Sequence, residues 1–140
     1  MPRTVHLFAD LAAPPAEIYE TYLDPKQHAA LTGAPVEVSR RPGSPFSAFG
    51  GQLRGTMLHT VENRLIVQAW RSSGWKESDP DSILILSLEP LGRRGTRVDL
   101  LHANLPDHDA AGVSLGWQQY YFIPWRAKLA AKPKRARPRR

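Results

Sequence analysis

Hydrophobic residues recur along this chain with two different periods, and the changes of period divide it into four parts. Residues 3–11 alternate, with Val5 and Leu7 facing one way and His6 and Phe8 facing the other. Alternation of this kind predicts a strand that is buried on one face. The chain therefore opens with a strand.

Two short helices are expected after this strand. A proline pair at 14–15 interrupts the alternation, and proline is favoured in the first turn of a helix, so we predict a helix over 15–23. Asp24 and the proline after it end that helix and begin a second one over 25–31. Gly33 ends the second helix, because glycine readily adopts the left-handed conformation of a helix end.

The alternation then resumes in short runs separated by turn signals. We predict strands at 35–39, 46–50, 53–61, 64–72, 82–90 and 95–104. Short strands joined by tight turns pair with their sequence neighbours, which implies an antiparallel meander. In the last strand Val98, Leu100 and His102 share one face, and we expect this face to point inward.

The last predicted element is an aromatic helix over residues 108–131, with Asp107 or Asp109 as its N-terminal cap. At helical spacing, one apolar stripe holds Val113, Trp117, Tyr120, Tyr121 and Pro124, and a second stripe holds Leu115, Phe122, Trp125 and Leu129. The first stripe can pack against the sheet. The second needs another neighbour, which is a further element of the fold, a bound apolar molecule or a partner protein. Pro124 should bend the helix and leave space beneath it.

Together these elements predict an α+β domain over residues 1–131, in which a curved antiparallel sheet of six to seven strands packs against the long C-terminal helix. Nothing in the sequence approaches the length of an apolar membrane span, and we expect a cytoplasmic protein. The absence of cysteine excludes disulfides and thiolate chemistry.

The net charge of +6 is concentrated at the C-terminus. The last nine residues, KPKRARPRR, hold six of the nineteen Lys and Arg, so residues 1–131 carry thirteen bases and thirteen acids. We expect 132–140 to be a disordered basic tail, either simply solvated or in screened, non-specific contact with phosphates or an acidic surface. No nucleic-acid-binding motif accompanies it, so we expect no specific nucleic-acid partner.

Candidate catalytic and metal-binding groups are scattered. The histidines are His6, His28, His59, His102 and His108, and no two have the spacing that holds a metal ion on one face. No serine lies in a nucleophile motif, and no pair of acids is forced into a dry site. We therefore expect no metal, no cofactor and no catalytic residue. His102, predicted to point inward near Trp117, is either a core imidazole bonded by its neighbours or the polar anchor of a ligand.

Three segments resemble a known family. They are FSAFGGQLRGTMLHTVENRLIVQAWRSSGW (46–75), GTRVDLLHANLP (95–106) and GWQQYYF (116–122). The Gly-rich hairpin, the strand ending in Trp-Arg, the strand ending in His with Pro soon after, and the Gly-Trp of the last helix are similar to the family named for the activator of the heat-shock protein 90 ATPase. The resemblance covers about 10–131. It implies the helix-grip fold of the START-related, pollen-allergen-like superfamily, with an apolar cavity between helix and sheet.

Two functional hypotheses follow. The first is a non-enzymatic binding module that takes a small hydrophobic or amphipathic ligand between the sheet and the C-terminal helix. Its expected ligand-binding residues are Phe49, Trp70, Trp75, Leu86, Leu100, His102, Trp117 and Tyr121, each of which could instead be ordinary core packing. The alternative, implied by the resemblance, is a chaperone-associated interaction domain. Its outward stripe, Leu115, Phe122, Trp125 and Leu129, would bind a chaperone or a second copy of the chain to form a homodimer.

Overall fold

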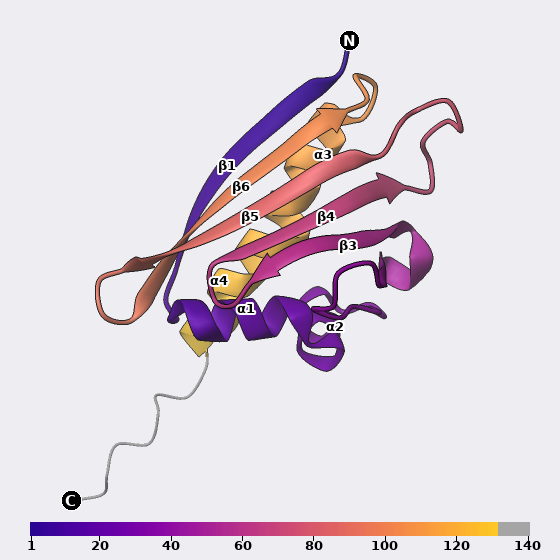
Figure 1. Ribbon diagram of the computed structural model, residues 1–140. Coiled ribbons are helices and arrows are strands. Elements are labelled where there is room, and N and C mark those ends of the chain that lie inside the picture. Colours follow the sequence, from indigo (N-terminus) through magenta and orange to yellow (C-terminus); the bar gives the residue numbers. More distant parts are fainter. Residues whose placement is uncertain (132–140) are drawn as a thin grey trace, which may run out of the picture.

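A computed structural model describes residues 1–131 of the protein (Figure 1). The elements in order are β1 (Arg3–Leu11), α1 (Pro15–Leu23), α2 (Pro25–Thr32), β2 (Pro45–Ala48), a 3-10 turn η1 (Phe49–Gly51), β3 (Leu53–Val61), β4 (Leu65–Ser72), β5 (Ser82–Leu91), β6 (Gly95–Leu105), α3 (Ala110–Trp117), a π-helical turn η2 (Gln118–Phe122) and α4 (Ile123–Ala131). The strands form one sheet in the order β1-β6-β5-β4-β3-β2, with antiparallel neighbours throughout. The predicted α+β meander with two short helices after its first strand is confirmed.

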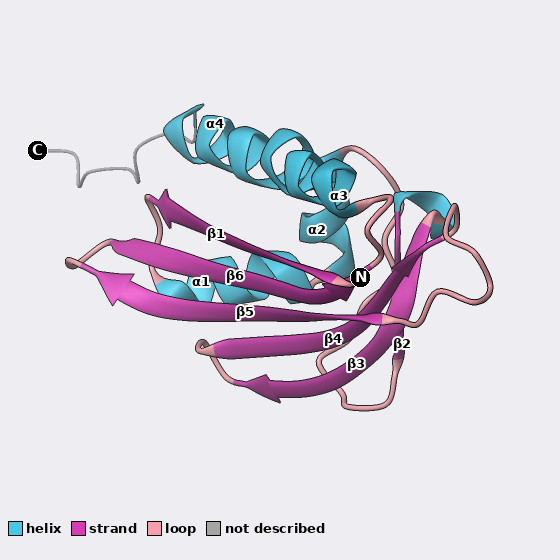
Figure 2. Cartoon of the chain, turned by 90° about the horizontal axis from the view of Figure 1, so that it is seen from above, coloured by secondary structure: helices cyan, strands magenta, loops and turns pink. Residues whose placement is uncertain are grey.

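The long C-terminal helix, made of α3, η2 and α4, runs along one face of the curved sheet (Figure 2). The face that it covers carries the alternate residues that the sequence assigned to the interior. Val98, Leu100 and His102 of β6 are buried, whereas Arg97, directly before Val98, is exposed. On β1, Phe8 is exposed. Period-two alternation therefore fixes which side of the sheet meets the helix.

The two short helices end and begin as their capping residues dictate. Pro15 stands in the first turn of α1, and the Asp24 carboxylate accepts a hydrogen bond from the Gln27 amide at the start of α2. Gly33 ends α2 with a φ of 78°, a conformation that costs glycine little. The helix pair buries Tyr22 and other apolar residues against one end of the sheet.

The prediction of a strand at 35–39 is wrong. There Glu37 and Ser47 form an isolated bridge, with a backbone hydrogen bond of 2.9 Å in each direction. Prolines at 35 and 42 bracket the segment, and proline has no amide hydrogen to donate to a ladder. The pairing therefore stops after one residue.

The prediction that Phe122 and Trp125 face outward is also wrong, since these side chains are only 3% and 4% exposed. The reason is the π-helical turn η2, in which the Ile123 amide donates to the Gln118 carbonyl, one residue further back than in an α-helix. Each residue of an α-helix advances by about 100°, so one extra residue rotates everything after it by about that angle. The second apolar stripe thereby turns into the core beyond η2.

Leu115, which precedes η2, stays on the outside and is 52% exposed. Leu129 is half-buried and packs against the core. Pro124 supplies the physical cause of the turn, because a proline ring collides with the carbonyl four residues earlier in a regular helix. The widened turn accommodates it without ending the helix.

The predicted basic tail, 132–140, lies outside the described residues. Within residues 1–131, no helix is long and apolar enough to cross a membrane.

Candidate functional site

A pocket of about 330 Å³ opens between the first half of the long helix and the end of the sheet where β3 and β4 lie. Its walls are Phe49, Gln52, Leu53, Trp70, Ser72, Asp109, Gly112, Val113, Gly116, Trp117, Tyr120 and Tyr121. The volume is in the range of small-molecule sites, and the mixture of aromatic rings with a few polar groups is typical of them. We refer to it as the aromatic pocket.

Two glycines of α3 leave room for this pocket. Gly112 and Gly116 are one helical turn apart and both line it. A Cβ atom added to Gly116 would meet one side-chain atom of Tyr120, at 3.8 Å, and nothing closer. The helix therefore stands away from the sheet at a place where any larger residue would fill the gap.

The η1 turn forms the outer wall of the pocket. Phe49 has a φ of 52°, in the left-handed region that non-glycine residues rarely adopt, and Gly50 follows it with a φ of 64°. The Gly50 amide holds the turn by donating to the Pro35 carbonyl at 3.2 Å. This backbone places the Phe49 ring edge-on to Tyr120 and Tyr121, at centroid distances of 5.5 and 6.4 Å.

Four of the expected ligand-binding residues line the aromatic pocket: Phe49, Trp70, Trp117 and Tyr121. The other four, Trp75, Leu86, Leu100 and His102, are buried away from it. Leu86 and Leu100 are cross-strand neighbours in the middle of the sheet, where side chains fill the interior. The aromatic pocket therefore lies under the first half of the long helix.

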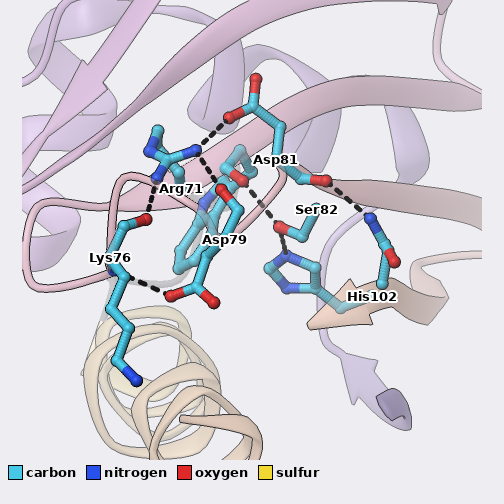
Figure 3. Close-up of polar contacts among 8 residues, drawn as sticks. Arg71, Lys76, Asp79, Asp81, Ser82 and His102 are labelled. Atoms are coloured by element: carbon cyan, nitrogen blue, oxygen red, sulfur yellow. Dashed lines mark hydrogen bonds and ion pairs between the residues drawn. The ribbon is translucent and has the colours of Figure 1, made fainter. Parts of the chain in front are cut away.

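His102 is bonded on both ring nitrogens by the protein itself. The Trp117 indole donates to Nδ1 at 3.1 Å, and since an indole N–H can only donate, the proton of His102 is on Nε2. Nε2 then donates to Ser82 Oγ at 2.8 Å, and Ser82 Oγ donates to the Trp70 carbonyl at 2.7 Å. Figure 3 shows Ser82 and His102 joined in this way. Burial lowers the pKa of His102 to about 3, so the ring is neutral.

This direction of hydrogen bonding argues against a nucleophilic serine. A base that activates serine must accept its proton, whereas His102 donates to Ser82. Both side chains are fully buried, with no exposed surface for a substrate. His102 is thus bonded like a core histidine, the first of the two alternatives that the sequence left open, and it does not line the aromatic pocket.

A second buried histidine was not singled out from the sequence. His28 donates from Nδ1 to the Tyr22 carbonyl at 2.8 Å and accepts at Nε2 from the Tyr121 hydroxyl at 2.6 Å. Burial lowers its pKa to about 4 and raises the pKa of Tyr121 well above its ordinary value. The bond ties α2 to η2 directly behind the pocket wall. Its sequence signal was the spacing of His28 and Leu31, which places both on the buried face of α2.

Asp109 lines the pocket and contacts the loop between β4 and β5. Asp109 is the N-terminal cap position of α3, but its side chain makes no capping bond and instead accepts from the Trp75 indole at 2.7 Å. Arg71 shapes the loop by donating to the Asp81 carboxylate at 2.7 Å and to the backbone carbonyls of Asp79 and Lys76 at 3.0 Å each (Figure 3). The planar guanidinium suits three acceptors at once, and it holds Trp75 in place.

One polar atom at this site has no hydrogen-bond partner. Among the described residues, the Trp70 indole nitrogen is the buried side-chain nitrogen or oxygen that remains unpaired. Trp70 is only 4% exposed, and it is a wall of the aromatic pocket. Leaving a buried donor unpaired costs on the order of 1–3 kcal/mol, so native structures rarely retain one without a reason.

The described part of the chain contains no group of three or more His, Asp or Glu side chains that could hold a metal ion. Two exposed histidines pair singly with carboxylates, His6 with Asp99 at 2.7 Å and His108 with Asp79 at 2.8 Å. The site can therefore bind a molecule through shape, aromatic contact and a few hydrogen bonds.

A curved antiparallel sheet closed by a long C-terminal helix, with two short helices after the first strand, defines a helix-grip protein. Within this class, residues 12–122 match the model of the family "Activator of Hsp90 ATPase homolog 1-like protein". The chain belongs to this family.

An uncharacterized protein of Schizosaccharomyces pombe, C1711.08, is 46% identical over 63 residues, which are 45% of this chain and 19% of the relative. The matched part is thus about a fifth of the length of that curated relative.

Solved structures agree in fold. The Plasmodium falciparum protein PFC0360w, described as an HSP90 activator, has a TM-score of 0.77 and 23% identity, covering 86% of this chain and 90% of its own. CalU16 from Micromonospora echinospora has a TM-score of 0.75 and 22% identity, covering 94% and 78%. CV1439 from Chromobacterium violaceum has a TM-score of 0.73 and 28% identity, covering 92% and 98%. The likeness to the first two shows the fold alone.

Proposed function

We propose that the protein binds a small hydrophobic or amphipathic molecule in the aromatic pocket, without catalysing a reaction on it. The observation that carries this proposal is a pocket of about 330 Å³ walled by Phe49, Trp70, Trp117, Tyr120 and Tyr121 in the otherwise filled space between helix and sheet. Aromatic walls offer large apolar area with little conformational entropy to lose on binding.

The geometry of α3 supports a binding role over ordinary packing. A helix that served only to cover the sheet would be stabilised by a larger residue at position 116, because glycine costs about 1 kcal/mol in a helix relative to alanine and leaves the gap unfilled. Gly116 in particular has space for a side chain. An open pocket at that position is explained if a ligand occupies it.

Gly116→Leu tests the proposal. The new side chain would occupy the pocket, and it should raise stability or leave it unchanged because leucine is a good helix former. The probe is N-phenyl-1-naphthylamine, a neutral dye whose fluorescence rises in apolar surroundings. We expect the wild-type chain to bind it and Gly116→Leu to bind it at least tenfold more weakly.

Ala111→Leu is the matched control, since Ala111 is exposed on the same helix and does not line the pocket. This variant should bind the dye like the wild type. Equal binding by Gly116→Leu and the wild type would show that the dye sits elsewhere and would contradict the proposal.

A protein-interaction role is the second candidate, and it is favoured by the exposed apolar residues of the long helix. Leu115 is 52% exposed and Ile123 is 59% exposed, although Phe122 and Trp125 are removed from any such surface by burial. These residues could contact a chaperone or a second copy of the chain. Sedimentation of the wild type and of a Leu115→Lys, Ile123→Lys variant, with and without purified heat-shock protein 90, distinguishes the cases. A monomer that binds no chaperone would exclude this role.

A further inference from the structure

Asp109 gives the aromatic pocket its charge. Among the described residues, no Lys, Arg, His or Glu lines the pocket beside it. Arg71, on the neighbouring loop, has its guanidinium 5.8 Å from the Trp75 ring, but it is already paired with Asp81 at 2.7 Å (Figure 3). Carboxylates are ionised at neutral pH, so the aromatic pocket carries a negative charge that no cationic wall offsets.

The protein uses one of the two oxygens of this carboxylate. Oδ2 accepts from the Trp75 indole at 2.7 Å, and the described residues supply no hydrogen-bond donor to Oδ1. Asp109 is half-buried, yet the buried side-chain atoms without a partner in residues 1–131 include the Trp70 indole nitrogen and not Oδ1. Oδ1 is therefore accessible to solvent, and it can accept a hydrogen bond from a bound molecule.

Gly112 shows on which side of the helix this oxygen lies. A Cβ atom added to Gly112 would lie 2.6 Å from Oδ1, so Oδ1 stands beside the bare backbone of Gly112, which is itself a wall of the pocket. Asp109, Gly112 and Gly116 are three and four residues apart and therefore share one stripe of the helix. All three line the pocket, which extends about 10 Å along this stripe, at 1.5 Å for each residue from 109 to 116.

The end of the pocket away from Asp109 is aromatic. Tyr120 continues the stripe by one more turn, and its ring lies edge-on to Phe49 at 5.5 Å. The rings of Trp117 and Tyr121 lie 4.6 Å apart beside it. The faces of such rings attract cations as well as apolar surface. A molecule that lies along the stripe thus meets a carboxylate at one end and aromatic rings at the other.

Given the proposed function, on which this inference rests, we propose that the aromatic pocket selects an amphipathic cation. This ligand is a protonated amine whose N–H donates to Asp109 Oδ1 and whose flat apolar body lies against Trp117 and Tyr121. An anion of the same shape would lose its hydration and meet the carboxylate, which is unfavourable. The net charge of +6 attracts anions at long range, so a preference for a cation has to come from the pocket itself.

Three probes of matched shape test this proposal on the full chain. They are 2-(aminomethyl)naphthalene, which is cationic at pH 7, 2-(hydroxymethyl)naphthalene, in which a hydroxyl replaces the ammonium group, and 2-naphthoate, which is anionic. Affinities are measured by calorimetry or ligand-observed NMR. We expect the amine to bind at least fivefold more tightly than the alcohol, as a half-buried ion pair implies, and at least tenfold more tightly than the carboxylate.

Asp109→Asn removes the charge and keeps the shape. The amide oxygen of asparagine can still accept from the Trp75 indole, and asparagine suits the start of a helix, so the variant should fold like the wild type. We expect it to bind the amine and the alcohol with equal affinity.

Asp107→Asn is the matched control, because Asp107 is an exposed acid two residues away that pairs with Arg3 and does not line the aromatic pocket. It changes the net charge by the same amount and should keep the preference for the amine. Gly116→Leu should weaken the binding of both probes, which would assign them to this pocket.

Ionic strength gives a second readout that needs no variant. Added salt screens the attraction between the ammonium group and a partly exposed carboxylate. Raising sodium chloride from about 20 mM to about 500 mM should therefore reduce the preference of the wild-type chain for the amine over the alcohol, while the affinity for the alcohol should not fall.

The outcomes separate the two proposals. Equal binding of the amine and the alcohol by the wild type at low salt would overturn this inference and leave the proposed function standing. A preference for the amine that persists in Asp109→Asn would overturn it as well, because the charge would then act from elsewhere. If neither these probes nor the dye binds, the proposed function itself fails. The wild-type comparisons decide the matter even if Asp109→Asn folds poorly.

Discussion

The two buried histidines predict that mild acid destabilises the protein. Burial lowers the pKa of His28 to about 4 and that of His102 to about 3, whereas an exposed histidine has an ordinary pKa of 6.5. The folded chain therefore binds fewer protons than the unfolded chain between pH 6.5 and pH 4. Under this condition the free energy of unfolding falls as the pH falls.

The magnitude follows from proton linkage. At pH 5, an unfolded histidine is almost fully protonated while His28 and His102 in the folded chain are neutral, and the difference amounts to about 2 kcal/mol for each residue relative to pH 8. The two together contribute about 4 kcal/mol, which is a large share of the roughly 5–15 kcal/mol that stabilises a typical domain. The two carboxyl groups with a lowered pKa do not contribute to the loss of stability between pH 8 and pH 5. Asp10 and Asp79 have a pKa lowered by hydrogen bonds to Arg97 and His108, so the stability they contribute is lost only as the pH falls below 3.8.

Urea unfolding followed by tryptophan fluorescence at pH 8.0, 6.5 and 5.0 measures the effect. His28→Gln and His102→Gln should each reduce the loss between pH 8 and pH 5 by about 2 kcal/mol, whatever each variant costs at pH 8. His59→Gln, at an exposed position of β3, is the matched histidine-to-glutamine control. A wild-type chain that is equally stable at pH 8 and pH 5 would refute the reasoning, since it would mean that His28 and His102 take up protons in the folded state.

Four further substitutions, one of them a control, test other contacts. Gly55→Ala would place a Cβ atom 1.8 Å from a backbone oxygen of β4, so we expect the free energy of unfolding to fall by about 3 kcal/mol or more. A Cβ atom at Gly74 would meet nothing, so Gly74→Ala should leave stability unchanged. Thermal melting of both variants checks this. Arg71→Lys removes the fork that binds the β4–β5 loop, and hydrogen exchange of that loop should become faster, whereas unchanged exchange would mean that the loop holds its own shape. Tyr121→Phe leaves His28 without a donor to Nε2 and should cost about 1–3 kcal/mol in urea unfolding; a neutral result would show that this hydrogen bond contributes no net stability.

The fold could be predicted because its signals are local. Alternation over β6 assigns Val98, Leu100 and His102 to the interior, and the structure confirms it. The capping residues Asp24 and Gly33 set the limits of α2. Each of these features depends on residues within one turn or one strand, which sequence periodicity reports directly.

The site was predicted less well, since it depends on contacts between distant residues. The sequence identified Phe49 and Trp117 as walls, but it could not show that the Trp117 indole would satisfy His102 and so remove that histidine from the pocket. Nor could it show that the Trp70 indole would be left unpaired. Both outcomes depend on which acceptor lies within about 3 Å of a given donor, and tertiary packing decides this.

The π-helical turn marks the inner limit of the aromatic pocket. After η2, the rotated stripe brings Phe122 and Trp125 into the core, and a separate groove lies between α4 and the two short helices. Before η2, Gly116 lines the aromatic pocket without a side chain, so the space stays open. Tyr121, held by its hydrogen bond to His28, stands at the boundary and closes the inner end of the pocket. A regular α-helix through Pro124 would expose the rings of Phe122 and Trp125 and would lose this boundary. The π-helical turn, which the helical pattern did not predict, therefore also defines the pocket.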